Sequence, residues 1–310
     1  MKIRKINTLL AVFLGAAIAY AGCKKDDGAI PSRVTVTDVP TITTNVDATG
    51  STIINVLNTT TAATFAGKFK VDNYFPGAPT PSKVDIVVRK NNFHPLTNSG
   101  ANANNSNVKL YKAGVATLPV TFTITAAEIA TLFGAPISAY DNYDFAPDIY
   151  VGDRKFEAFP ATGIGTGSGH VAHPLYSEFA RYGALCQDAN FHQGNFEVVS
   201  DAFPNGFTAG QVVTLTKVSN TRFTFKVPFV TNATDIIVNI GATTNILSVT
   251  KQQIGDAFTF DATQTKPNVT VASAVTNFIE PCAKTIDLNI TYQTDQKLFP
   301  GTYLLRLRKL

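Results

Sequence analysis

The feature that most constrains this chain is an alternation of apolar and polar residues that recurs from Val34 almost to the C-terminus. A period of two gives a strand one apolar and one polar face, and Gly, Pro and Asn between such runs are typical of turns. Thr, Val, Ile and Phe are abundant, and these residues fit pleated, half-buried surfaces. The sequence therefore predicts an all-β fold.

Strands are expected in the first half at residues 34–37, 53–57, 65–71, 84–88 and 118–125. The runs 143–151 and 154–159 flank Gly152-Asp153, which is typical of a β-hairpin. The run from Leu175 to Leu185 fits a helix or a strand, and we interpret it as a strand that closes the first domain. We expect an Ig-like β-sandwich domain over residues 34–184.

One helix and one long loop interrupt this pattern. Thr125 and Glu128 have the spacing of a capping box, Ile129 and Leu132 share a helical face, and Gly134 is a stop signal. We therefore expect a short helix between two strands. Residues 91–107 are rich in Asn and are predicted to form an exposed loop.

The second half carries closely spaced runs with short links. Strands are expected at residues 196–199, 212–218, 222–227, 236–240, 246–254, 257–261, 269–275, 286–292 and 303–307. Consecutive strands with short links favour a meander, which closes economically as a barrel or a sandwich. For residues 185–310 we expect an antiparallel β-meander domain, either a second antiparallel β-sandwich or a lipocalin-like meander barrel.

The N-terminal segment has the composition of an export signal. Three cations, Lys2, Arg4 and Lys5, precede an apolar run over residues 9–19. That run is shorter than the roughly 20 residues that span a bilayer, and small residues follow it, as in a secretory signal peptide. We therefore expect residues 1–22 to be a signal peptide.

Cys23 follows directly on Ala-Gly, and this motif resembles the lipobox of bacterial lipoproteins. The resemblance implies that Cys23 carries the lipid and that residues 23–33 form a lipidated tether. Tyr20 departs from the family, which usually has Leu there. Lys24-Lys25-Asp26-Asp27 resembles the surface-export signal of Bacteroidota lipoproteins. For Cys23, the alternatives are an ordinary thiol beside a generic cleavage site and an N-terminal segment that remains as an anchor. For the charged run after it, the alternative is a solvated tether.

The charge of the chain argues against nucleic-acid binding. The formal net charge is +4, and it falls to +1 without the three cations of the signal peptide. The remaining part has no basic stripe of the kind that nucleic-acid binders need.

Two cysteines remain besides Cys23, namely Cys186 and Cys282. An even number in an exported protein suggests a disulfide. If the first and late strands of a closed meander are neighbours, the two residues come within the Cα separation of ~5.5–6 Å that a bridge needs. Buried free thiols, intermolecular pairing and a metal pair are the alternatives.

The chain also resembles the two-module surface lipoproteins of the Bacteroidota. The resemblance rests on the lipobox, the Asp-rich hairpin from Asp141 to Asp153, the segment Gly194–Asp201, the element Lys251–Gly255 and the late Pro281-Cys282. It implies an outer-membrane lipoprotein that faces the cell exterior, often with a role in nutrient capture. The family brings no catalytic signature.

Candidate chemical sites are few, and we expect neither an enzyme nor a metal or cofactor site. His170 and His173 lie three apart between Gly169 and Pro174, and only His192 is near enough in sequence to be a third zinc ligand. The four aspartates of the hairpin do not have EF-hand spacing and suit turns better than calcium. These aspartates are Asp141, Asp144, Asp148 and Asp153. The alternating glycines from Gly163 to Gly169 lack a phosphate-binding pattern.

Aromatic residues near expected turns are the remaining candidates for ligand binding. They are Tyr74, Phe75, Phe93, Phe191 and Phe203. Exposed rings can stack on sugars or anchor a protein partner, whereas packing into the core is the alternative. The absence of Trp argues against an aromatic platform for glycan binding. We expect a lipid-anchored protein that binds an extracellular ligand, a glycan or an outer-membrane protein partner. The rival hypothesis is a structural or adhesive surface subunit without a small-molecule ligand.

Overall fold

The structure is a computed structural model that describes residues 40–74, 80–92, 107–161, 165–167, 176–271, 277–299 and 301–310. Pro40–Leu310 is one compact unit, and every element named below belongs to it. The expected strand at residues 34–37 and most of the expected loop at residues 91–107 lie outside the described residues. Asn91 and Asn92 are the last residues of a strand, so the loop prediction is wrong at those two positions.

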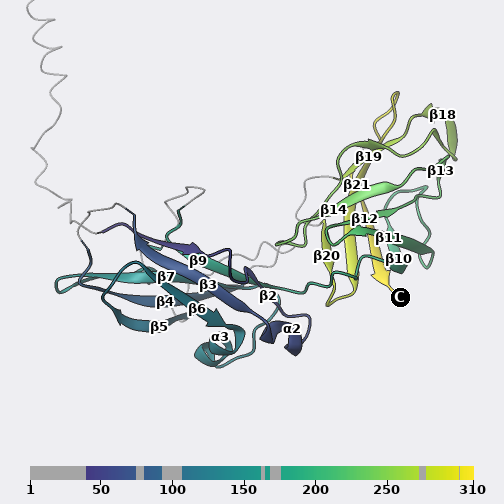
Figure 1. The fold of residues 1–310 in the computed structure, drawn as a ribbon. Coiled ribbons are helices and arrows are strands. Elements are labelled where there is room, and N and C mark those ends of the chain that lie inside the picture. Colours follow the sequence, from purple (N-terminus) through teal and green to yellow (C-terminus); the bar gives the residue numbers. More distant parts are fainter. Residues whose placement is uncertain are drawn as a thin grey trace, which may run out of the picture. The chain divides into compact units, whose positions relative to one another are not determined.

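The first group of strands forms two facing sheets, which we call the N-terminal sandwich (Figure 1). One sheet has the order β1 (Ile42–Val46), β3 (Ala66–Asn73), β6 (Val120–Thr125). The other has the order β2 (Ile53–Asn55), β9 (Ala180–Leu185), β7 (Asp141–Val151), β4 (Lys83–Asn92), β5 (Val108–Val115), and β8 (Arg154–Phe156) pairs with β7. All these pairs are antiparallel except β2 with β9. The all-β prediction is confirmed, and the ambiguous run is a strand at 180–185.

Aromatic rings connect the two sheets of the N-terminal sandwich. Phe69 of β3 and Phe145 of β7 are fully buried, and their ring centroids lie 5.1 Å apart. Tyr182 of β9 packs edge-on against Phe145. Antibody domains join their sheets by a disulfide at the centre of the core. Here aromatic packing provides that connection, which agrees with the lack of a cysteine in these strands.

The expected helix is α3 (Ala126–Phe133), and its capping box is confirmed. The hydroxyl of Thr125 accepts a hydrogen bond from the backbone N–H of Glu128, and the Glu128 carboxylate accepts one from the backbone N–H of Thr125. Gly134 ends the helix in the left-handed conformation. A second, shorter helix, α2 (Thr59–Ala63), begins at an Asn58 cap and was not predicted from the sequence.

The second group of strands, which we call the C-terminal meander, follows the chain order around its sheet. Its strands are β10 (Gly194–Asp201), β11 (Val212–Ser219), β12 (Arg222–Phe225), β14 (Ile236–Ile240), β15 (Leu247–Ser248), β16 (Gln252–Gln253), β19 (Asn268–Val271), β20 (Phe278–Glu280), β21 (Thr285–Gln293) and β22 (Tyr303–Lys309). A small separate sheet contains β13 (Val230–Thr231), β17 (Ala257–Phe258) and β18 (Asp261–Thr265). The long strand expected at 246–254 is divided into β15 and β16.

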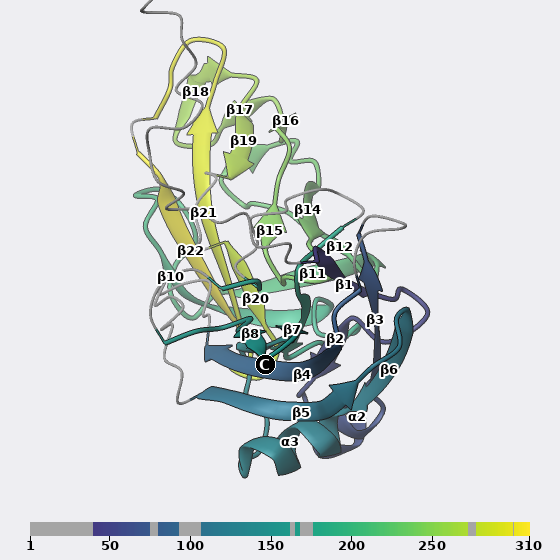
Figure 2. The same ribbon diagram turned by 90° about the vertical axis from the view of Figure 1, so that its left-hand side faces the viewer.

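Two contacts bring strands that are distant in the chain together in the C-terminal meander. The last strand, β22, lies between β10 and β21 (Figure 2). At the other end, a bridge joins Ile246 to Phe278, and the N–H of Leu247 donates to the carbonyl oxygen of Asn277 at 2.8 Å. The sheet therefore curls as a half-barrel around one apolar core.

Candidate functional site

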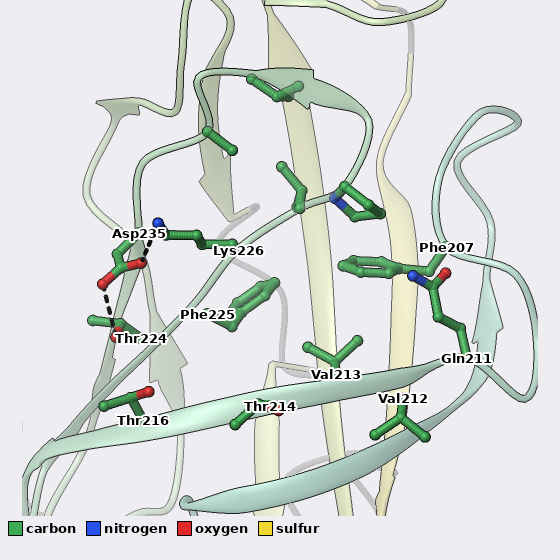
Figure 3. A pocket seen from close by; sticks show the side chains of 14 residues that line it. Phe207, Gln211, Val212, Val213, Thr214, Thr216, Thr224, Phe225, Lys226 and Asp235 are labelled. Atoms are coloured by element: carbon green, nitrogen blue, oxygen red, sulfur yellow. Dashed lines mark hydrogen bonds and ion pairs between the residues drawn. The ribbon is translucent and has the colours of Figure 1, made fainter.

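The C-terminal meander contains a pocket of about 560 Å³ where β11 and the segment after β12 separate (Figure 3). One wall is Gln211–Thr216, and the other is Thr224–Pro228. Both the inward-facing Val213 and the outward-facing Val212 and Thr214 line it. Contributions from both faces of β11 place the pocket at the edge of the strand, in a gap between neighbouring strands.

The gap opens because the hydrogen-bonded ladder between β11 and β12 is short. Its last pair is Thr216 with Thr224. Continuation in the same register would place Lys226 opposite Thr214 and Pro228 opposite Val212. Proline has no N–H to donate, so a proline at this position favours the end of a ladder. The alternating pattern predicts a strand as far as Val227, whereas β12 ends at Phe225.

The direction of the main chain follows from the neighbouring strand. The carbonyl oxygen of Gln211 accepts a hydrogen bond from the N–H of Val198 in β10 at 2.8 Å. Main-chain groups of successive residues in a strand point to opposite sides. Those of Val213 and Leu215 therefore point toward β10, and those of Val212 and Thr214 point into the gap. The gap thus presents N–H and C=O groups that the β11–β12 ladder leaves unpaired.

The lining combines an apolar floor with a polar rim. Phe207, Phe225 and Val230 are buried in the core of the meander and form part of the floor. At the rim, the Lys226 ammonium lies 3.9 Å from the Asp235 carboxylate. The hydroxyl of Thr224 donates to the same carboxylate at 3.4 Å. Figure 3 shows this group on the opposite side of the gap from Val212 and Gln211.

Asp201 fixes the loop that brings Phe207 to the pocket. Its carboxylate accepts hydrogen bonds from the backbone N–H of Phe203 at 2.9 Å and of Phe207 at 2.8 Å. Burial raises the pKa of Asp201, although both hydrogen bonds act in the opposite direction. Asp201 and the pocket were not predicted from the sequence. The one available signal for the pocket was Pro228, which follows an alternating strand.

Cys186 and Cys282 form a disulfide, as the sequence predicted, with their Cα atoms 5.8 Å apart. Cys186 follows β9, and Cys282 lies between β20 and β21. Nearby, the side-chain amide of Asn245 donates to the carbonyl oxygen of Cys186 at 2.8 Å. The bond therefore ties the start of the C-terminal meander to its late strands β20 and β21.

The predicted aromatic binding residues are not gathered into one site. Phe191 and Phe203 are buried in the core of the C-terminal meander, so the core-packing alternative describes them. Tyr74 follows β3 and packs edge-on against Tyr176, with ring centroids 4.8 Å apart. Phe75 and Phe93 lie outside the described residues. The ligand-binding assignment of Phe191 and Phe203 is therefore corrected to a structural role.

The candidate metal ligands have other partners. His192 is buried and its Nε2 donates to the carbonyl oxygen of Ser219 at 2.7 Å, while His170 and His173 lie outside the described residues. Asp141 and Asp148 form ion pairs with Lys90 and Lys155. Asp144 pairs with two arginines, and Asp153 belongs to the hairpin turn after β7. In the described ranges, no three His, Cys, Asp or Glu side chains are arranged to hold a metal ion.

Comparisons with known proteins identify no family for this chain. No family model matches it, and no curated protein matches it. A solved structure from Bacteroides ovatus, described as a structural genomics protein of unknown function, aligns with 86% of this chain and 93% of its own. The identity is 9% and the TM-score is 0.19, so this likeness carries no argument. Within the residues that the structure describes, no helix has the length and hydrophobicity required to cross a membrane.

Proposed function

We propose that this protein is a lipid-anchored outer-membrane lipoprotein of the Bacteroidota that faces the cell exterior and binds a protein partner there. The partner would enter the pocket between β11 and β12 as an extended peptide segment. The observation that carries the peptide-binding part of this proposal is the edge of β11 that faces the segment after β12 across an apolar floor. Strand addition uses such edges for affinity and side-chain pockets for specificity.

The chemistry of the pocket favours a peptide over a glycan. Sugar-binding platforms present the faces of exposed aromatic rings. The two rings of this pocket, Phe207 and Phe225, are both buried, and the chain contains no Trp. A peptide strand would instead pair with the main chain of Val212 and Thr214. Its alternate side chains would lie over the apolar floor and beside Lys226 and Asp235.

A proline substitution tests this mode of binding. Linear peptides are selected from a random display library on the purified protein, and their affinities are measured by fluorescence anisotropy. Thr214→Pro removes an N–H that points into the gap, whereas Thr214→Ala is the matched control that retains it. We expect Thr214→Pro to weaken binding about three- to tenfold, because one backbone hydrogen bond contributes roughly 0.5–1.5 kcal/mol.

Two outcomes would contradict the peptide proposal. In the first, the library yields no peptide that binds above background, while an oligosaccharide from a panel raises the melting temperature of the protein. In the second, both Thr214 variants bind the selected peptides equally. No binding by either probe class would instead favour the structural or adhesive subunit. Melting curves of both variants are needed to show that each one folds.

The anchor is tested separately by Cys23→Ser. The substitution removes the thiol that the lipobox resemblance assigns to lipid attachment, so the exported protein is expected in the soluble fraction. Labelling of cells with a radioactive fatty acid should mark the wild type and leave the variant unlabelled. A variant that stays in the membrane pellet without label would show that Cys23 is not the anchor.

A further inference from the structure

The outer face of the sheet that contains β4, β7 and β9 carries a row of three charged residues. Arg89 of β4 is directly opposite Asp144 of β7, and Asp144 is directly opposite Arg181 of β9. The Arg181 side chain contacts Asp144 through Nε at 2.7 Å and Nη2 at 3.0 Å. Arg89 contacts it through Nη2 at 3.1 Å. We call these three residues the arginine row.

The arginine row has more positive charge than its carboxylate neutralises. Asp144 is completely buried, and it also accepts a hydrogen bond from the side-chain amide of Asn91 at 3.0 Å. Two guanidinium groups with one carboxylate leave a net charge of +1. The neighbouring cations have carboxylate partners outside the row: Lys90 pairs with Asp141, and Lys155 pairs with Asp148 and Glu157.

Both guanidinium groups are held in place while one edge of each remains available. The Arg89 guanidinium lies 4.2 Å above the ring of Phe159, and that of Arg181 lies 5.0 Å above the ring of Phe179. Among the described residues, the Nη1 atom of neither arginine has a hydrogen-bond partner. The Arg181 side chain is 52% exposed and that of Arg89 is 22% exposed. A ligand can therefore approach donors that are already oriented.

We propose that the arginine row binds a carboxylate group of an extracellular ligand, at a site separate from the β11–β12 pocket. A planar carboxylate matches the fork of donors on a guanidinium, and its charge complements the net charge of the row. Asp144 positions the two arginines from beneath. The carboxylate has two natural sources, a uronic acid of a glycan and an acidic residue of a peptide.

Isothermal titration calorimetry with three probes tests this site. The probes are an oligogalacturonate, a short polyglutamate peptide and inorganic sulfate, in buffer at moderate ionic strength. We expect one of the two carboxylate probes to bind more tightly than sulfate, and that probe identifies the source. Sulfate binding of equal strength would overturn the proposal, because it would show attraction to charge without carboxylate recognition.

Matched substitutions test whether the carboxylate probes bind at the arginine row. Arg181→Gln removes a charge while it keeps a donor for Asp144, and we expect a loss of about tenfold or more in affinity, because charge-assisted forks are among the strong hydrogen bonds. Arg181→Lys should recover only part of this loss, since Lys lacks the fork. Arg222→Gln removes the same charge from β12, far along the chain, and should leave affinity unchanged.

Asp144→Asn distinguishes a binding site from a purely structural ion cluster. The substitution raises the net charge of the row to +2, so it should lower stability and yet strengthen carboxylate binding. An Arg181→Gln protein that folds and binds the probes as the wild type does would overturn the proposal. So would an absence of binding by both carboxylate probes at millimolar concentration.

Discussion

Cys186 and Cys282 are 96 residues apart in the sequence, and their disulfide encloses most strands of the C-terminal meander. Its removal enlarges the unfolded ensemble, and the chain-entropy model gives roughly 4–5 kcal/mol for a loop of this length. We expect the Cys186→Ser/Cys282→Ser variant to unfold at lower denaturant concentration, with a loss of about 2–5 kcal/mol. Equilibrium unfolding in guanidinium chloride measures the difference.

Reductant provides the control for the disulfide. It should lower the stability of the wild type toward that of the double variant and leave the variant unchanged. Equal stability of the two proteins without reductant would show that the bond contributes nothing. Recovery of both cysteine peptides in separate alkylated form, after non-reducing digestion of the exported protein, would show that the bond does not form.

His192 should make the C-terminal meander sensitive to mild acid. Burial lowers the pKa of His192 below its ordinary value of 6.5, although the hydrogen bond to Ser219 and nearby Asp188 oppose this shift. The unfolded chain then binds a proton at a pH where the folded chain does not. Stability should therefore fall as the pH drops through about 6.5 toward the lowered pKa of the folded state.

His192→Gln separates this effect from other titrations. Glutamine keeps a donor for the Ser219 carbonyl oxygen and has no charge to gain. Between about pH 7.5 and about pH 5.5, a range that spans the ordinary His pKa, the melting temperature of the wild type should fall more than that of the variant. Parallel curves for the two proteins would contradict this role for His192. Lys217 and Lys309 also face the imidazole and remain in both proteins.

The sequence predicted those features of the fold that depend on local chemistry. The capping box of α3 needs only Thr125, Glu128 and their spacing, and the hairpin after β7 needs only its turn residues. The antiparallel pairing of consecutive strands in the second half and the disulfide also followed, because short links favour pairing between strands that are neighbours in the chain. In each case the information lies in neighbouring residues or in chain connectivity.

The features that the sequence did not predict depend on contacts between distant residues. Phe203 precedes a proline, as a loop residue often does, yet its ring packs 4.4 Å from that of Tyr292 in β21. The pocket exists because β11 pairs with β10 beyond the point at which it leaves β12. The arginine row requires the register of β4, β7 and β9. Periodicity gives the face of a residue but no information about its cross-strand partner.

Phe203 should be a major contributor to stability. Its ring contacts those of Phe229, Phe258, Phe260, Phe299, Tyr292 and Tyr303. Phe203→Ala leaves a cavity at the centre of this group and should cost about 3–5 kcal/mol. Phe260→Ala is the matched control, because Phe260 is 37% exposed, and it should cost clearly less. Chemical denaturation of both variants checks the order, and equal losses would contradict it.

Gly206 should be required for the conformation of the loop that carries Phe207. A Cβ at position 206 would overlap the Asp201 carboxylate and lie 3.0 Å from the Phe203 carbonyl oxygen. The carboxylate cannot move without loss of its hydrogen bonds to the N–H groups of Phe203 and Phe207. Gly206→Ala should therefore lower stability by about 1–3 kcal/mol, the range for overpacking a filled site, and weaken peptide binding in the adjacent pocket.

A double-mutant cycle identifies the cause of that loss. Asp201→Ala removes the carboxylate that a Cβ at position 206 would meet, and it should itself be destabilising because two backbone N–H groups lose their acceptor. In the Asp201→Ala protein, the further change Gly206→Ala should cost less than it does in the wild type. Residues in direct contact give interaction energies of about 0.5–3 kcal/mol in such cycles. Additive losses would show that the strain at Gly206 comes from the Phe203 backbone and that Asp201 has no part in it.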